Sequence, residues 1–433
     1  MTNDFLSDLE ARGLVHQVSQ PSHEGWPSLQ QRLAQGPITA YIGFDPTAAS
    51  LHVGSLLPVM NLARLQRAGH RPIAIVGGGT GLIGDPSGKA SERAMLTKEQ
   101  LEANVAGLRG QLERWLDFGG ERGARLVNNA DWLCELRLLD FLRDIGKLFS
   151  VNQMVVRDSV KQRLDGREQG ISFTEFSYSL LQGYDFLVLH DRHGCELQMG
   201  GSDQWGNITD GIDLIRRLRS KPSFGLTSPL VTKADGAKFG KSEKGNVWLD
   251  AGMTRPFSFH QFWLNQGDAD AVRYLGYFTF VPTEEIAAIA AKMQAEPQLR
   301  HAQRRLADEV TRFVHGEKAL QSALRASAVL FEGGDLKALS ADELADAFAE
   351  TPRTKLDPAT LGTPEASLAA VLAATKLEPS KGRARTAIES GAVSVNGVVE
   401  KDPNRVLVAA DRLTGGFVVL RRGKKSYHIV ETL

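Results

Sequence analysis

Residues 38–84 decide the fold: ITAYIGFDPTAASLHVGSLLPVMNLARLQRAGHRPIAIVGGGTGLIG. The run ITAYIGF at 38–44 is apolar and uninterrupted, as in a buried strand. Residues 54–68 carry apolar side chains at helical spacing, and PIAIV at 72–76 is a second short apolar run. A strand, a helix and a strand in this order predict parallel pairing within an α/β sheet.

The same alternation continues beyond this stretch. Thr97 and Gln100 form a capping-box pattern that opens a helix reaching about Trp115. Residues 196–199 are typical of a strand, and 202–219 of a helix. We therefore predict a doubly wound, Rossmann-like parallel sheet covered by helices on both faces.

The composition changes along the chain and predicts further domains. The α/β pattern occupies 1–235, and 256–331 is helical throughout. Residues 332–360 are acidic and interrupted by Gly and Pro, as in a linker. Residues 361–433 form a small α+β domain, and 380–433 hold ten Lys/Arg against five Asp/Glu, a net charge of +5. That excess is either a solvated surface or a face that binds RNA.

Composition also excludes several classes of protein. A length of 433 residues predicts two or three domains, and 24% charged residues argue against disorder. The net charge is zero, so contact with nucleic acid needs a local basic patch. The two cysteines, Cys134 and Cys195, form neither a disulfide framework nor a zinc pair. No run approaches the roughly 20 apolar residues that span a bilayer. The early acidic residues exclude a secretory signal, so we expect a soluble, cytoplasmic protein with no membrane partner.

The glycine-rich run resembles two nucleotide-binding motifs without matching either. Residues 79–84 fit GxGxxG, but no strand ending in Asp or Glu follows about 20 residues later. Residues 84–90 (GDPSGKA) resemble a P-loop with three residues between the glycines instead of four, and Ala90 replaces the Ser or Thr. A tight glycine turn accounts for the run better than either motif does. Once its neighbours are considered, we favour a third interpretation, a loop that approaches a substrate closely.

Three short motifs predict a nucleotide site. They are DPT at 45–47, HVGS at 52–55 and KFGKS at 238–242, the last within a glycine- and lysine-rich loop at 236–255. The second and third resemble the paired HIGH and KMSKS signatures of class I aminoacyl-tRNA synthetases. The resemblance implies that ATP, accompanied by Mg²⁺ and with no dedicated protein metal site, is bound here.

The chemistry of amino-acid activation fits these residue types. A carboxylate attacks the α-phosphorus of ATP without proton transfer, so positioning and charge stabilisation dominate. His52 donates to phosphate oxygens beside a helix N-terminus, and Thr47 donates to the same phosphates. Gly54 lets the adenine approach the backbone, and Lys238 and Lys241 clamp the departing phosphates. A satisfied, buried imidazole is the alternative for His52.

A third cluster lies in FTEFSYSLLQGYDFLVL at 173–189. Tyr178, Gln182 and Asp185 are spaced i, i+4 and i+7, so they share one helical face. A phenol, an amide and a carboxylate among apolar neighbours indicate a buried polar face, which requires a polar ligand.

The whole chain resembles bacterial tyrosyl-tRNA synthetases. The matching stretches are YIGFDPTAASLHVGS, GTGLIGDPSGK, FLRDIGKLFSVNQM, GISFTEFSYSLLQGYDF, GGSDQWGN, LVTKADGAKFGKS and RRGKK. The resemblance implies tyrosine contacts from Tyr41, Asp85, Tyr178, Gln182, Asp185 and Gln204. It implies catalytic or ATP contacts from Gly43, Asp45, Thr47, His52, Gly54, Ser55, Lys89, Arg93, Gly201, Asp203, Lys238, Lys241 and Ser242. It also implies a homodimer through the segment 141–173.

The tail resembles the RNA-binding module named after a small ribosomal-subunit protein. The matching residues include SKGRAR at 380–385 and GAVSVNG at 391–397, whose Asn-Gly pair predicts a hairpin turn. The resemblance implies that tRNA(Tyr) is the partner, with the helical domain near its anticodon. The implied phosphate contacts are Lys381, Arg383, Arg385, Arg421, Arg422, Lys424 and Lys425.

Two rival functions remain, and one departure from the family pattern favours the first of them. Ser55 stands where the family usually has a second histidine. A non-catalytic RNA-binding paralogue would tolerate this change, but it has no need for both ATP motifs. Another nucleotidyltransferase with an HxGx motif would leave the polar helix face and the RNA module unexplained. The sequence thus favours a tyrosine-specific ligase.

Overall fold

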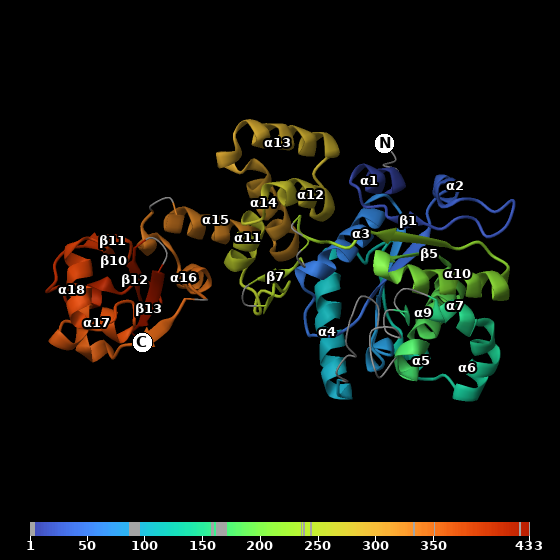
Figure 1. Cartoon of the computed structure of the whole chain (residues 1–433), viewed down its shortest axis with the longest axis horizontal. Helices are drawn as coiled ribbons and strands as arrows, with labels where there is room; N and C mark the ends of the chain where they lie inside the picture. The colour runs from blue at the N-terminus through green and yellow to red at the C-terminus, as the bar shows by residue number, and fades with distance from the viewer. Residues whose placement is uncertain are drawn as a thin grey trace. The chain divides into compact units, whose positions relative to one another are not determined.

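The computed structural model describes residues 5–85, 96–156, 160–161, 171–234, 236, 239–242, 245–331, 334–349, 351–423 and 426–432, without the side chains of 241 and 242 (Figure 1). The chain divides into two compact units. Unit 1 comprises 1–250 and 266–306, and unit 2 comprises 251–265 and 307–433. The helical stretch that composition assigned to one domain, 256–331, is therefore shared between the two units.

Unit 1 is built on a six-stranded sheet in the order β1-β6-β5-β2-β3-β4. All pairs are parallel except β1 with β6, so the predicted parallel sheet is confirmed and gains one antiparallel edge. The strands are β1 Gln17–Val18, β2 Thr39–Phe44, β3 Arg71–Val76, β4 Arg125–Asn128, β5 Cys195–Gly201 and β6 Phe224–Ser228. Strands β1, β4 and β6 were not predicted, because each is short and lacks a long apolar run.

The strand order creates a switch point between β2 and β5. From β2 the chain moves outward through β3 to β4, then returns to β5 on the other side of β2 and continues to β6. Right-handed crossovers therefore place the helices of the two halves on opposite faces of the sheet. Ligands in such sheets bind beyond the carboxyl ends of the strands at this point.

The helices that cover the sheet start and stop at residues suited to those positions. The predicted capping box at Thr97 and Gln100 is present and opens α4. Ser172 caps α9 through the N–H of Glu175, and Gly194 ends it with a φ of 61°. The helices of unit 1 are α1 Phe5–Ala11, α2 Leu29–Ala34, α3 Leu56–Arg67, α4 Lys98–Trp115, α5 Ala130–Leu133, α6 Leu138–Asp144, α7 Val151–Val155, α9 Phe173–His193, α10 Trp205–Arg219, α12 Asp268–Phe278 and α13 Thr283–Ala295.

Helices α9 and α10 pack side by side on one face of the sheet (Figure 1). Their core includes Phe186 and Ile208, both fully buried, together with Ile73 of β3. Tyr41 of β2 lies in the same cluster with its ring centroid 5.4 Å from that of Phe186. The helix with the predicted polar face is thus anchored beside the switch point.

Unit 2 combines helices with a second, five-stranded sheet in the order β11-β10-β12-β13-β9. Its strands are β9 Arg353–Lys355, β10 Val393–Val395, β11 Val398–Glu400, β12 Phe417–Arg422 and β13 Ser426–Glu431. Its helices are α11 Pro256–Leu264, α15 Glu317–Phe331, α16 Ala341–Ala347, α17 Leu368–Ala374 and α18 Lys381–Glu389, and α14 His301–His315 crosses the boundary with unit 1.

The acidic stretch at 332–360 differs from the predicted linker. Its described part contains α16 and β9, and β9 pairs in parallel with β13. Ser340 and Glu343 form a capping box at the start of α16. Local capping and strand pairing outweigh a composition that, on its own, is typical of a linker.

The predicted Asn-Gly hairpin is present between β10 and β11. Asn396 has a φ of 50° and Gly397 a φ of 85°, as a turn with two left-handed residues requires. Asn396 Nδ2 also donates to the carbonyl of Asp411 at 2.6 Å, and its Oδ1 accepts the N–H of Val419 at 2.8 Å. One residue therefore shapes the turn and ties it to two distant segments.

Replacing Asn396 by alanine removes both hydrogen bonds and leaves a Cβ-bearing residue without Asn's tolerance for positive φ. We expect a loss of about 2 kcal/mol in the local stability of the β10–β13 sheet. Hydrogen exchange of the full chain, read on peptides from that sheet, measures it. The control is Asn404→Ala at an exposed turn position of the same domain. Equal protection in the two variants would contradict the assigned role.

Candidate active site

A cavity of about 660 Å³ lies beyond the carboxyl ends of β2 and β5. That volume is ordinary for a small-molecule site and accommodates an amino acid beside a nucleotide. Fourteen of the residues predicted from the sequence line it: Tyr41, Gly43, Asp45, Thr47, His52, Gly54, Ser55, Asp85, Tyr178, Gln182, Asp185, Gly201, Asp203 and Gln204. Residues up to 163 positions apart in the chain therefore meet in one place.

Some predicted residues fall outside the part of the chain that the structure describes. Lys89, Arg93 and Lys238 do so entirely, as do Lys424 and Lys425 of the tail. Lys241 and Ser242 lie in the short strand β7 Lys241–Ser242, which pairs with β8 Gly245–Asn246, but their side chains are not described.

Backbone hydrogen bonds join the HVGS turn and its neighbour Leu51 to the loop at 236–255, which contains the KFGKS motif. Val53 N–H donates to the carbonyl of Val247 at 2.9 Å, and Leu249 N–H donates to that of Leu51 at 2.8 Å. Gly240 has a φ of 87°, and a Cβ there would lie 3.1 Å from a methyl carbon of Val53. Only glycine combines this backbone conformation with so close an approach. The lysine loop is thus seated against the HVGS turn.

His52 presents a defined tautomer to the cavity. Its Nδ1 accepts the N–H of Gly54 at 3.0 Å, so the neutral ring carries its proton on Nε2 and donates from there. A Cβ at position 54 would lie 2.7 Å from Cε1 of this ring, so glycine is required. His52 is partly exposed and lines the cavity, which does not fit the alternative of a buried core histidine.

Ser55 also lines the cavity. It is the N-cap residue of α3, yet its side chain makes no capping hydrogen bond to that helix. The hydroxyl at the position that departs from the HIGH pattern is therefore not committed to capping.

Asp185 is a buried carboxylate at the inner end of the cavity, with 3% of its surface exposed. Its Oδ1 accepts the indole N–H of Trp132 at 2.7 Å, and its Oδ2 accepts an amide N–H of Asn129 at 2.9 Å. Burial raises the pKa of Asp185 to about 7, although both donors act to lower it. This carboxylate is therefore poised between its two protonation states near neutral pH.

Tyr41 complements that carboxylate. Its side chain is 1% exposed, and within the described residues its hydroxyl has no hydrogen-bond partner. Burial raises the pKa of Tyr41 well above its usual value, and the charge of Asp185 raises it further. A buried hydroxyl without a partner is costly, so this position favours a ligand with a polar atom.

A chain of polar side chains forms another part of the wall. Tyr178 donates to Oδ1 of Asp45 at 3.3 Å. Gln182 donates to Gln204 at 3.2 Å, and Gln204 donates to Asp85 at 2.8 Å. Two carboxylates with hydroxyl and amide partners provide a site suited to an ammonium group. The three residues predicted to share one face of α9 all line the cavity.

Sequence reasoning missed Asn129 and Trp132, the two donors to Asp185. Asn129 follows β4, and Trp132 lies on α5, just beyond it. The signal available was the Asn128-Asn129 pair at the carboxyl end of a strand, but the strand itself, RLVN, was too short to recognise. A polar pair at that edge of a parallel sheet is typical of a site.

Asn128 and Asn129 also fix the backbone of the glycine-rich run. Asn128 Oδ1 accepts the N–H of Gly78 at 3.1 Å, and Asn129 Oδ1 accepts those of Gly79 at 2.8 Å and Thr80 at 3.4 Å. These N–H groups serve the protein's own side chains, whereas in a dinucleotide fingerprint the loop backbone faces a phosphate. This part of the run is a turn that supports Asp185 through Asn129. Gly77, Thr80 and Asp85 also line the cavity, as the interpretation of a substrate-approaching loop requires.

The basic residues of the tail differ in what they contact. Lys381, Arg383 and Arg385 are exposed on α18. Arg422 on β12 pairs with the buried Glu378, and Arg421 donates to Ser394 Oγ at 3.3 Å. The α18 residues form an accessible basic patch, whereas the two β12 arginines also have structural partners.

Among the described residues, no group of three or more His, Cys, Asp or Glu side chains could hold a metal ion. The described helices include none with the length and apolar character needed to cross a membrane.

The chain matches two family models. Residues 33–332 match the class I tRNA synthetases of the tryptophan and tyrosine type (W and Y), and 343–430 match the C-terminal domain of SYY-like tyrosine–tRNA ligases. Tyrosine–tRNA ligase 2 of Enterococcus faecalis is 49% identical over 432 residues, which is 100% of both chains.

Solved structures agree with this match. The C-terminally truncated mitochondrial tyrosyl-tRNA synthetase of Aspergillus nidulans is 32% identical with a TM-score of 0.66, over 76% of this chain and 94% of that one. Its counterpart from Coccidioides posadasii is 31% identical with a TM-score of 0.64, over 75% and 91%. The chain therefore belongs to the class I tRNA synthetases and, within them, to the family of tyrosine–tRNA ligases, which are ATP-dependent.

Proposed function

We propose that the cavity binds tyrosine and ATP side by side and forms tyrosyl-adenylate, from which tyrosine passes to the 3′-terminal adenosine of tRNA(Tyr). The observation that carries this proposal is the buried pair of Tyr41 and Asp185. The Tyr41 hydroxyl has no hydrogen-bond partner among the described residues, and together with the Asp185 carboxylate it suits the hydroxyl of a bound tyrosine. The full-length identity to a tyrosine–tRNA ligase supports the same assignment.

At the inner end of the cavity, Asp185 accepts a hydrogen bond from the hydroxyl of the substrate phenol, and Tyr41 hydrogen-bonds the same oxygen. Phenylalanine would enter without a hydroxyl. The buried Tyr41 hydroxyl would then stay without a partner, and Asp185 would have only Trp132 and Asn129 as donors, which is costly in a desolvated site. At the other end of the substrate, Asp85, Tyr178 and Gln182 hold the ammonium group, and Gln204 lies near the carboxylate. The hydrogen bonds that join Gln182, Gln204 and Asp85, and the bond from Tyr178 to Asp45 beside them, support this arrangement.

In the activation step, a carboxylate oxygen of tyrosine attacks the α-phosphorus of ATP. The bond from that phosphorus to the bridging oxygen breaks, and pyrophosphate leaves with the electron pair. His52 donates from Nε2 to phosphate oxygens, Thr47 donates beside it, and Lys238 and Lys241 stabilise the charge on the leaving group. Lys89, Arg93 and Ser242 assist at the pyrophosphate end.

The nucleotide itself contacts Gly43, Asp45, Gly54 and Ser55, and its ribose contacts Gly201 and Asp203. All six line the cavity, which supports these roles. Mg²⁺ would neutralise the phosphate oxygens and accompany ATP. We assign it to the nucleotide because the described side chains offer no cluster of three ligands.

The remaining domains serve the tRNA. The catalytic domain at 1–235 and its lysine loop at 236–255 act on the amino acid, and helices within 256–331 lie near the anticodon. The domain at 361–433 binds RNA through Lys381, Arg383 and Arg385 on α18, together with Arg421, Arg422, Lys424 and Lys425. The exposure of the α18 residues supports this part.

The enzyme works as a homodimer through the segment 141–173. Large apolar side chains are exposed in and beside this segment, a pattern that marks association surfaces. They are Leu138 (69%), Leu139 (78%), Leu142 (42%), Val151 (59%), Val156 (69%) and Phe173 (76%). Its tRNA substrate and its two free cysteines support a cytoplasmic location.

ATP–pyrophosphate exchange with each of the twenty amino acids offered separately tests this proposal. We expect exchange with tyrosine alone. Lys241→Ala should slow tyrosine-dependent exchange by about a hundredfold, in the range for loss of a charge-stabilising group, and leave tyrosine affinity unchanged.

The matched control is Lys221→Ala, at an exposed position just before β6 and thus at the opposite edge of the sheet. Silence with all twenty amino acids would favour the non-catalytic RNA-binding paralogue. A loss of tyrosine affinity in Lys241→Ala would show that the loop has another role.

The raised pKa of Asp185, about 7, predicts the pH dependence of tyrosine binding. The acceptor must be ionised, so affinity should rise by about tenfold between pH 6 and pH 8, as the ionised fraction grows from about one tenth to nine tenths. Equilibrium titration of the enzyme with tyrosine measures this. Asp185→Asn should bind weakly and without that dependence, and a flat wild-type profile would disprove the assignment.

Replacing Lys381, Arg383 and Arg385 together by alanine should weaken tRNA binding and lower its salt slope by about 2 to 3, close to one unit for each phosphate that is no longer neutralised. Exchange without tRNA should not change. The matched control removes three exposed lysines of the same unit, Lys355, Lys376 and Lys401. If both triple variants lose the same affinity for tRNA, α18 contributes only through the net charge of the protein and is no specific contact surface.

A further inference from the structure

Residues 228–234 connect the cavity to the lysine loop. Ser228 ends β6, and Pro229, Leu230, Val231 and Thr232 line the cavity. The loop with Lys238 and Lys241 follows within a few residues. The position of 228–234 therefore determines where the loop begins.

Helix α12 holds the far end of this segment through three side chains at i, i+3 and i+4. Both carboxylate oxygens of Asp270 accept the N–H of Ala234, at 3.0 and 3.2 Å. Arg273 Nη2 donates to the carbonyl of Thr232 and to Asp270, each at 2.5 Å. Tyr274 Oη donates to the same carbonyl at 3.0 Å. Asp270 is 6% exposed, so its bonds to Ala234 are largely shielded from water, whereas the bond from Arg273 to Thr232 is exposed.

The same helix contacts the loop itself. Phe239, between the two lysines of the KFGKS motif, lies against Tyr274 with ring centroids 4.9 Å apart. It also stacks on Phe278, at 5.4 Å and an interplanar angle of 16°. Helix α12 thus contacts both the backbone that leads into the loop and an aromatic side chain within it.

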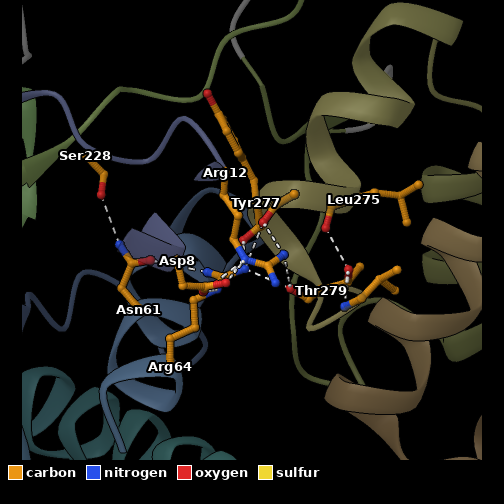
Figure 2. Close-up of polar contacts among 10 residues, drawn as sticks. Asp8, Arg12, Asn61, Arg64, Ser228, Leu275, Tyr277 and Thr279 are labelled. Carbon is orange, nitrogen blue, oxygen red and sulfur yellow. Dashed lines mark hydrogen bonds and ion pairs between the residues drawn. The ribbon is translucent and has the colours of Figure 1, made fainter. Parts of the chain in front are cut away.

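The carboxyl end of α12 is fixed to α3, the helix that follows the HVGS turn (Figure 2). Arg64 Nη2 lies 2.9, 2.9 and 2.8 Å from the carbonyl oxygens of Gly276, Tyr277 and Thr279. The last carbonyls of a helix lack partners within it and carry partial negative charge, so a guanidinium suits them.

Arg64 also reaches the near end of the segment. Its Nη1 donates to Asn61 Oδ1 at 3.3 Å, and Asn61 Nδ2 donates to Ser228 Oγ at 3.0 Å, as Figure 2 shows. Asp8 adds a carboxylate 3.9 Å from Arg64 Nε. Burial lowers the pKa of Arg64 to about 9, which leaves the guanidinium charged at neutral pH. Ser228 and Ala234 are therefore both held, at opposite ends, by one connected pair of helices.

We infer that α3 and α12, joined by Arg64, form a brace that sets the position of residues 228–234 and thereby of the lysine loop. Asp270 and Arg273 are positioning residues for the activation step, because they act through the backbone of Thr232 and Ala234. This inference rests on the proposed role of Lys241 at the ATP phosphates. It predicts that the brace affects ATP and leaves tyrosine recognition, which lies at Tyr41 and Asp185, unchanged.

Asp270→Ala tests the brace in the full-length enzyme by ATP–pyrophosphate exchange. We expect kcat/KM for ATP to fall by about tenfold, comparable to the loss of one hydrogen bond to a charged group. KM for tyrosine should stay constant. Asp270→Asn retains one acceptor oxygen for the Ala234 N–H and should recover part of the loss.

The matched control is Asp268→Ala. Asp268 lies in the same first turn of α12 but accepts from Gln303 at 2.6 Å and has no hydrogen bond to 232–234. It should leave kcat/KM for ATP unchanged. Thermal unfolding of both variants shows whether each retains the native fold.

The double variant Asp270→Ala/Lys241→Ala separates this inference from the proposed function. If Asp270 acts through the loop, its loss should add little once Lys241 is gone. Full additivity, an equal rise in KM for tyrosine, or an equal effect of Asp268→Ala would overturn the brace. If Lys241→Ala alone has no effect on exchange, the proposed role of the loop fails instead.

Discussion

The parallel pairing of β2 with β5 is the constraint on which the rest of the site depends. These strands lie at the switch point of the sheet, so the chain departs from them in opposite directions and leaves an opening beyond their carboxyl ends. The register sets Tyr41 beside Gln198, with both side chains buried next to the cavity. The HVGS turn follows β2, and Gly201 and Asp203, which we assign to the ATP ribose, lie at the end of β5 and just beyond it. A shift in this pairing would displace both substrate regions together.

Asp185, at the inner end of the cavity, makes the stability of the fold depend on pH. Its folded-state pKa lies near 7, above the ordinary 3.8, because burial disfavours the charge more than Asn129 and Trp132 favour it. The folded state therefore holds this proton more tightly than the unfolded chain. Ionisation works against folding as pH rises between 3.8 and about 7. Burial of this carboxylate thus lowers stability, a cost that is common at functional sites and is consistent with the proposed role of Asp185 as a hydrogen-bond acceptor for the substrate.

Unit 1 holds the elements that we assign to ATP binding against shared supports. Backbone pairing seats residues 51–53 against 247–249, and α12 contacts the segment that enters the lysine loop. The helical stretch after residue 255 is divided accordingly, because α12 and α13 belong with the sheet domain and α11 and α15 with unit 2. Helical character alone does not reveal this division. It depends on which helix faces meet.

The sequence by itself determined the class of fold, the family and fourteen of the residues that line the cavity. Uninterrupted apolar runs predict central strands. Short motifs such as HVGS and the segment Tyr178–Asp185 can be recognised from their residue types and spacing alone. Only the tertiary structure showed that Asn129 and Trp132 support Asp185 and that residues 332–360 contain α16 and β9. It also revealed that a buried Arg64 joins α3 to α12. These features depend on contacts between residues as many as 215 positions apart, such as Arg64 with Thr279. A local pattern records what a residue can do, and only the packed fold decides what it meets.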